Sequence, residues 1–175
     1  MGLRIAGEFN TEKELCSAIY SPDVKDALGC SILEFTLAVD ECKTLRAHGF
    51  FVELDREPGK LISRMLLPSS LTLLFRQPGL KAHTALTHLH SHLAAVNEAY
   101  SRFFETRFVG RPTMRVLRPG TFHEYREWKI GRIGGGGLGM GQVKVPAVVL
   151  DAETVDWLEE RVSKEVMYID LNGCA

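Results

Sequence analysis

The sequence predicts an α+β fold, in which two long amphipathic helices pack on a mostly antiparallel sheet. Two stretches carry apolar residues at alternating intervals of four and three, which is the spacing of one helical face. Short apolar segments between turn residues supply the strands. With 175 residues, of which 45% are hydrophobic, the chain is long enough to bury one core, so we expect residues 1–175 to form a single domain.

A strand and a short helix are expected at the start of the chain. Residues 3–9 (LRIAGEF) are typical of a strand. Thr11 and Glu14 then have the spacing of a capping box, in which each side chain bonds the backbone N–H of the other residue. This spacing predicts a helix that ends at about Tyr20.

The first long helix is expected to follow directly. Ser21 is a suitable cap and Pro22 suits the first helical position. The apolar pattern continues until Gly49, where a glycine would end the helix. The residues of this stripe are Leu28, Ile32, Phe35, Val39 and Cys42.

The middle of the chain combines a hairpin with the second long helix. Residues 50–68 are interpreted as two strands around a turn at 57–59. Residues 81–104 form one amphipathic helix of about six turns, since apolar side chains again recur at intervals of four and three. These side chains belong to Ala82, Leu86, Leu89, Leu93, Val96, Tyr100 and Phe103.

The last third is expected to contain a surface strand, a glycine-rich loop and a final helix. His123 and Glu124 are placed on the strand, and residues 131–146 form the loop. Asp151 is expected to cap a helix whose apolar face runs from Val155 to Val166. The remaining residues form a last strand or an extended tail.

Four histidines between His83 and His92 raise the question of a metal site. On a helix, His88 and His92 share one face, whereas His90 points away from them. Paired histidines at this spacing bind zinc when a third ligand joins them, so a metal-dependent hydrolase is one alternative function. The other interpretation is a solvent-facing helix surface, because no acid stands between the two histidines. We expect no cofactor.

The glycine-rich loop and a neighbouring basic run form the expected interaction surface. The loop resembles that of CRISPR-associated RNA-processing endonucleases, which implies that RNA could bind there, with phosphates held by the basic side chains. RNA or DNA is therefore a second possible class of partner, after protein. The residues of the surface are Arg111, Arg115, Arg118, Arg126, Lys129, Arg132, Gly135, Gly137 and Gly139.

An acidic segment near the end of the chain could pair with this basic run. It contains Glu153, Asp156, Glu159 and Glu160. The two segments could pair within one molecule, or head to tail between copies, which is how rings and filaments form. We therefore expect a homo-oligomer, with a ring as one closed form, that also contacts other assembly subunits.

Composition excludes several other classes. The net charge is −1, so no global field attracts nucleic acid or membrane. Five charged residues interrupt the first twenty positions and leave no apolar signal core. No apolar stretch is long enough to span a membrane, and the four cysteines lack a CxxC pair. These features predict a cytoplasmic protein without a membrane partner. No catalytic grouping such as GxSxG occurs.

The first fifty residues resemble the start of tail-completion and minor-tail proteins of tailed bacteriophages. The resemblance rests on residues 1–19, a glycine-containing strand followed by a helix, and on residues 23–29 (DVKDALG), which open the longer helix. It implies a non-enzymatic, self-associating subunit of a phage tail terminus or neck, located in the virion. It carries over no site residues.

Overall fold

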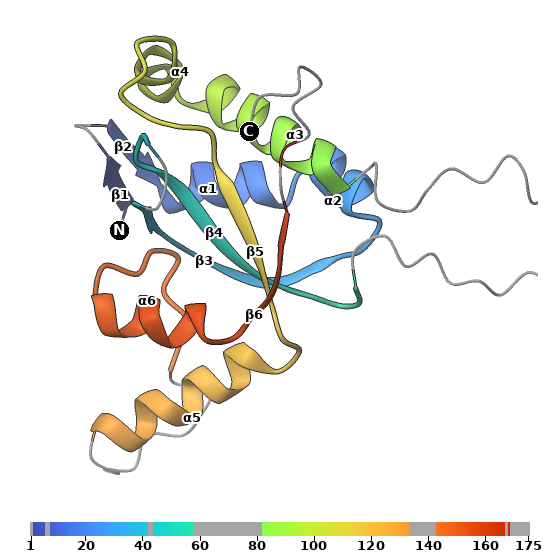
Figure 1. Cartoon of the computed structure of the whole chain (residues 1–175), viewed down its shortest axis with the longest axis vertical. Helices are drawn as coiled ribbons and strands as arrows, with labels where there is room; N and C mark the ends of the chain where they lie inside the picture. Colours follow the sequence, from blue (N-terminus) through green and yellow to red (C-terminus); the bar gives the residue numbers. More distant parts are fainter. Residues whose placement is uncertain are drawn as a thin grey trace, which may run out of the picture.

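The structure is a computed structural model, and it describes residues 2–5, 8–41, 44–57, 82–133, 143–166 and 168 (Figure 1). These residues form an α+β fold with six helices and a four-stranded mixed sheet that does not close into a barrel. None of the described helices is long and apolar enough to cross a membrane. That residues 1–175 make one domain stays a prediction.

The main sheet has the strand order β3-β4-β5-β6. β3 pairs antiparallel with β4, β4 pairs parallel with β5, and β5 pairs antiparallel with β6. A short segment continues the sheet beyond β3, because Val148 forms a parallel bridge with Leu37. The strands are β3 (Ile32–Asp40), β4 (Ala47–Leu54), β5 (Thr113–Leu117) and β6 (Val162–Val166).

A separate hairpin opens the chain. β1 (Gly2–Ile5) pairs antiparallel with β2 (Glu8–Thr11), so the single strand predicted for residues 3–9 is two strands. α1 (Glu12–Ile19) follows with the predicted capping box: Thr11 accepts a bond from the Glu14 N–H, and Glu14 accepts one from the Thr11 N–H.

The first long helix of the prediction is wrong. α2 (Pro22–Leu28) does begin at Pro22, but it ends at Gly29, whose φ of 69° is the left-handed conformation of a helix terminator. The residues beyond it form β3 and β4. All eight residues of β4 are buried, and so are several consecutive residues of β3. Strands buried on both faces lose the alternating pattern that identifies a strand.

The second long helix is interrupted once. α3 (Ala82–Val96) and α4 (Glu98–Glu105) are separated at Asn97, whose side-chain oxygen accepts a 2.9 Å bond from the Tyr100 N–H. Asn97 thereby begins a new helix, which is the usual role of asparagine at this position. The apolar spacing passes through the break unchanged, so it could not reveal it.

The region predicted as a surface strand is a helix. α5 (Thr121–Ile133) contains His123 and Glu124, which are both exposed. Glu53 of β4 holds the beginning of this helix, because its carboxylate accepts bonds of 2.7 and 2.9 Å from the N–H groups of Gly120 and Phe122. This contact joins residues almost seventy positions apart, which local patterns cannot show.

α6 (Ala152–Glu159) begins at Asp151 as predicted, since the Asp151 carboxylate accepts a 2.9 Å bond from the Thr154 N–H. It ends earlier than expected, because Val162–Val166 form β6. In the predicted hairpin of residues 50–68, β4 accounts for the first strand, and the second lies outside the described residues.

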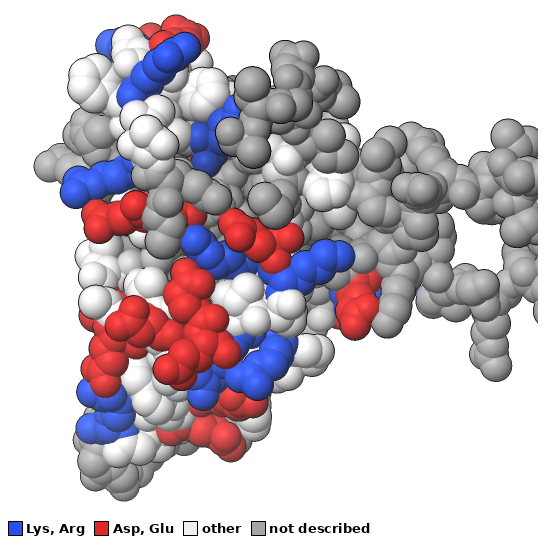
Figure 2. Space-filling model, in the orientation of Figure 1, with Lys and Arg blue, Asp and Glu red and all other residues white. Residues whose placement is uncertain are grey.

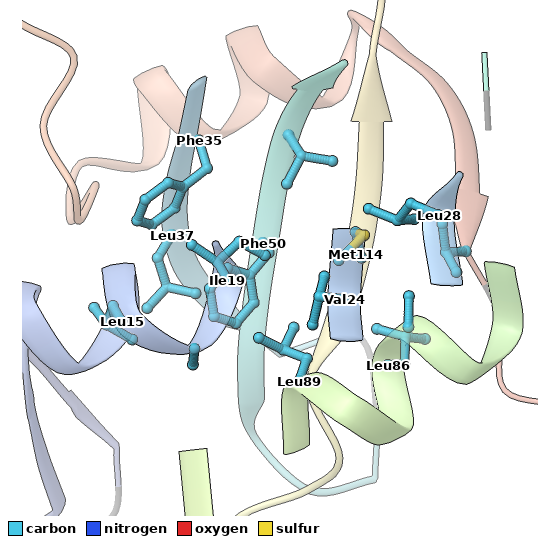
Figure 3. Packing of buried hydrophobic residues seen from close by; sticks show 14 of the residues in the cluster. Leu15, Ile19, Val24, Leu28, Phe35, Leu37, Phe50, Leu86, Leu89 and Met114 are labelled. Atoms are coloured by element: carbon cyan, nitrogen blue, oxygen red, sulfur yellow. The ribbon is translucent and has the colours of Figure 1, made fainter. Parts of the chain in front are cut away.

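Helices cover both faces of the sheet (Figure 1). α1, α2 and α3 lie on the first face, where leucines such as Leu15, Leu28 and Leu89 pack on Phe50 and Met114 (Figure 3). α5 and α6 lie on the second face over a smaller apolar cluster: Ala38, Phe51, Leu117, Phe122, Val149 and Leu158. Along β4 the side chains alternate between these two clusters, since Phe50 and Val52 belong to the first and Phe51 to the second.

Candidate functional site

A cleft of about 710 Å³ lies on the second face, between α6 and the strands. This volume is in the range of ligand and partner sites. Acidic side chains gather over α6 on the face shown in Figure 2. The lining residues are Ala38, Val39, Asp40, Glu41, Phe51, Arg115, Val149, Leu150, Ala152, Val155, Asp156, Glu159 and Glu165, and we call this set the acidic cleft.

Arg115 of β5 links the sheet to α6 within the acidic cleft. Its Nη2 donates a 2.9 Å bond to Oδ2 of Asp40, and its Nε lies 3.2 Å from Oε1 of Glu159. Thr113 donates a 2.7 Å bond to the same Asp40 oxygen. The side chain of Asp40 is 0% exposed and that of Arg115 is 10% exposed. The Arg115 charge is therefore matched within the fold.

Gly49 makes room for this ion pair. A Cβ atom at Gly49 would lie 3.0 Å from Nη1 of Arg115 and 3.2 Å from Cβ of Asp40. A side chain here would therefore push against the guanidinium. Gly49 lies within β4, where the absence of a side chain allows this close packing. The prediction that Gly49 ends a helix is wrong.

The acidic cleft carries excess negative charge, because five carboxylates line it with one guanidinium. Burial raises the pKa of Glu159; the Arg115 charge opposes this rise, while Asp40, Glu165 and Asp156 add to it. Carboxylates that raise each other's pKa are stabilised by a nearby positive charge. The cleft therefore favours cationic groups and repels polyanions.

Aromatic and basic side chains hold α5 against α6 beside the cleft. The rings of Trp128 and Trp157 stack with centroids 5.3 Å apart, and the Arg161 guanidinium lies 3.6 Å from the Trp157 centroid. Arg132 forms an ion pair with Glu153. Together with the Arg115–Glu159 contact, this pair shows that the basic run and the acidic segment meet within one molecule, which was one of the two predicted arrangements.

The described residues of the predicted interaction surface have different surroundings. Arg115 is buried, Arg126 pairs with Glu34, and Lys129 donates to Thr154. Arg111 and Arg118 are exposed, and the Arg111 guanidinium lies 5.0 Å from the Tyr168 ring centroid. Gly135, Gly137 and Gly139 lie outside the described residues. A surface that joins all of these residues stays a prediction.

The histidines of α3 take different partners. Nε2 of His92 lies 2.9 Å from Oδ2 of Asp23, and Nδ1 of His90 lies 2.8 Å from the Tyr100 hydroxyl. His88 is half-buried. Within the part of the chain that the structure describes, no three His, Cys, Asp or Glu side chains converge as metal ligands. Metal binding by His88 and His92 stays a prediction.

A buried polar network on the first face went unnoticed in the sequence. His48 is 0% exposed, its Nε2 lies 3.1 Å from Nδ2 of Asn10, and its ring packs edge-on against Tyr100. Asn97 donates to Asn10 from the break between α3 and α4. Burial lowers the pKa of His48 to about 4. In the sequence, the single histidine at position 48 does not reveal this contact.

Comparison with known proteins gives a family and a fold. The model of the GH3 family C-terminal domain matches residues 14–153. A solved structure named GH3.15 acyl acid amido synthetase superposes with a TM-score of 0.69 at 20% identity, over 95% of this chain and 27% of that one. A structure named AtGH3.15 acyl acid amido synthetase in complex with 2,4-DB gives a TM-score of 0.70 at 21% identity, over 95% and 26%.

This chain thus spans about a quarter of the length of those solved structures. No curated protein sequence matches it. The likeness in structure extends over nearly the whole chain and includes both faces of the sheet.

These matches overturn the predicted function. The resemblance to bacteriophage tail proteins is wrong, because one family model covers most of the chain, including the elements that the resemblance could not explain. The expectation of a non-enzymatic virion subunit is wrong for the same reason, since the family is one of enzymes. The metal-dependent hydrolase and the RNA-processing protein are replaced as well.

Proposed function

We propose that this chain, which belongs to the GH3 family by its C-terminal domain, serves as that domain in an acyl acid amido synthetase. The observation that carries the proposal is the family match over residues 14–153, which includes β3, β4, β5 and α5. The likeness to acyl acid amido synthetase structures over 95% of this chain supports it.

An amido synthetase must first activate a carboxylate, because an amine does not displace oxygen from it directly. In an adenylating enzyme a carboxylate oxygen bonds to the α-phosphorus of ATP, and pyrophosphate leaves with the electrons of the broken P–O bond. An amine then bonds to the carbonyl carbon, AMP leaves, and the nitrogen loses a proton. The acyl acid and an amino acid are thereby joined as an amide.

The electrostatics of the acidic cleft argue against nucleotide binding in it. Asp40, Asp156 and Glu159 would repel the phosphates of ATP, and Arg115 is already matched by carboxylates. The first of these synthetase structures is almost four times as long as the region that it shares with this chain. We therefore assign ATP binding to a surface other than this cleft.

The test is an activity assay on the protein purified from the cells that produce it. ATP, a panel of acyl acids and a panel of amino acids are supplied, and the amide product is measured by mass spectrometry. We expect amide and AMP in equal amounts, together with exchange of labelled pyrophosphate into ATP that requires the acyl acid. Reactions without acyl acid serve as the control.

Absence of both the amide and the acid-dependent exchange across the panels would reject the proposal. Exchange without amide would support activation and identify the amine as the missing substrate.

A further inference from the structure

An exposed apolar knob lies in the segment between α4 and β5. Phe108 is 61% exposed, and Arg107 and Arg111 near it are exposed as well. We call Arg107, Phe108 and Arg111 the Phe108 knob. Its surface presents one aromatic ring with two positive charges.

The conformation of the knob is fixed by the backbone. Arg107 has a φ of 60°, and it is the one non-glycine residue with positive φ in the described part of the chain. Such a conformation costs free energy for a residue with a side chain, so the surrounding contacts must impose it. The N–H groups of Phe108 and Val109 both donate to the Phe103 carbonyl, at 2.9 and 3.3 Å. The fold therefore holds Phe108 toward solvent.

The acidic cleft has the complementary properties. Val155 and Leu150, which is 63% exposed, supply apolar surface at the cleft, above the buried side chains of Phe51 and Val149. Asp156 and Glu159 supply negative charge along α6. The exposed Phe108 ring and the exposed Arg107 next to it in the sequence fit an apolar hollow edged by carboxylates in both polarity and charge.

We propose that the occupant of the acidic cleft is the Phe108 knob of a second copy of this chain. Phe108 would lie against the apolar lining, with Arg107 facing Asp156 and Glu159. The knob residues do not line the acidic cleft of their own chain, so the contact forms between molecules. This proposal does not depend on the amide-forming activity.

The first test measures self-association of the full 175-residue chain by sedimentation velocity over a range of concentrations. Wild-type chain is expected to associate, with a Kd that rises severalfold between 0.05 and 0.5 M NaCl because the ionic contacts are screened. Phe108→Ser should raise the Kd by about tenfold or more. Leu33→Ser is the matched control, since Leu33 is 59% exposed but lies on β3 outside the cleft, and its Kd should equal that of wild type.

The second test locates the partner surface. Asp156→Lys should weaken association as strongly as Phe108→Ser, whereas Asp26→Lys, an exposed carboxylate of α2 outside the cleft lining, should not. When Phe108→Ser and Asp156→Lys chains are mixed, the intact cleft of the first can bind the intact knob of the second. The mixture should therefore associate more tightly than either variant alone.

A wild-type chain that stays monomeric at all concentrations would overturn the proposal, and it would leave another part of a synthetase as the occupant. Association that is unchanged by Phe108→Ser, or a mixture that associates no more tightly than either variant alone, would also overturn it. Circular dichroism of each variant verifies that the fold is intact. None of these results bears on the amide assay, so the two proposals fail separately.

Discussion

The two faces of the sheet are built in different ways. The first face, under α1, α2 and α3, holds the large apolar cluster (Figure 3). The second face, under α5 and α6, has few buried apolar residues and relies on buried charges, with Arg115 bonded to Asp40 and Glu53 holding the start of α5. The first face buries the larger apolar cluster, and the second presents the cleft and its charges. Contacts with other molecules are therefore expected on the second face.

The largest predicted effect concerns the first face. Leu89 of α3 is 0% exposed within the large cluster, so Leu89→Ala leaves a cavity and should lower the free energy of unfolding by about 4 kcal/mol. Urea denaturation measures this loss. Leu150→Ala on the second face is the control and should change it by less than about 0.5 kcal/mol, because Leu150 is largely exposed. Equal losses at the two positions would contradict the comparison.

The next effect is a pH dependence that belongs to the first face. The pKa of His48 falls from 6.5 to about 4 on burial, so the unfolded chain binds the proton more tightly. Stability from this residue is complete above pH 6.5 and is lost as the pH falls toward 4, a change of about 3 kcal/mol. His48→Gln should remove this contribution to the pH dependence of the free energy of unfolding, which urea denaturation at a series of pH values measures. The control variant His123→Gln, on the surface of α5, should keep the same pH dependence as wild type.

The buried ion pair of the second face gives a smaller effect. Asp40→Asn removes the charge that faces Arg115 but keeps an oxygen acceptor, and Glu159 still offsets part of the guanidinium charge. We expect a loss of about 2 kcal/mol in the free energy of unfolding. Glu41→Gln should cost less than about 0.5 kcal/mol, because the Glu41–Arg46 pair is exposed. A similar cost for both variants would show that burial adds nothing to the Asp40 contact.

The sequence revealed helix starts better than it revealed strands. The capping box at Thr11, the proline at position 22 and the cap at Asp151 are local signals, and all three mark real helix starts. β3 and the start of β4 were assigned to a helix because the sheet is covered on both faces, so their apolar residues follow no period of two. Gly29 was the available signal for the end of α2.

The site was harder to predict than the fold. Asp40, Arg115 and Glu159 come from three elements and meet only after the sheet has formed. The sequence did indicate that basic and acidic segments could pair. It assigned Arg115 to the surface, because a buried arginine is recognised only when its partner is known.

The smallest predicted effect should be equal on the two faces. Thr11 caps α1 on the first face and Asp151 caps α6 on the second, each through one bond to a backbone N–H. Thr11→Ala and Asp151→Ala should each lower the free energy of unfolding by about 1 kcal/mol, measured by urea denaturation. Equal losses would show that the faces differ in what covers the sheet and not in how their helices begin. A much larger loss for Asp151→Ala would instead mean that α6, lacking a broad apolar contact, depends on its cap.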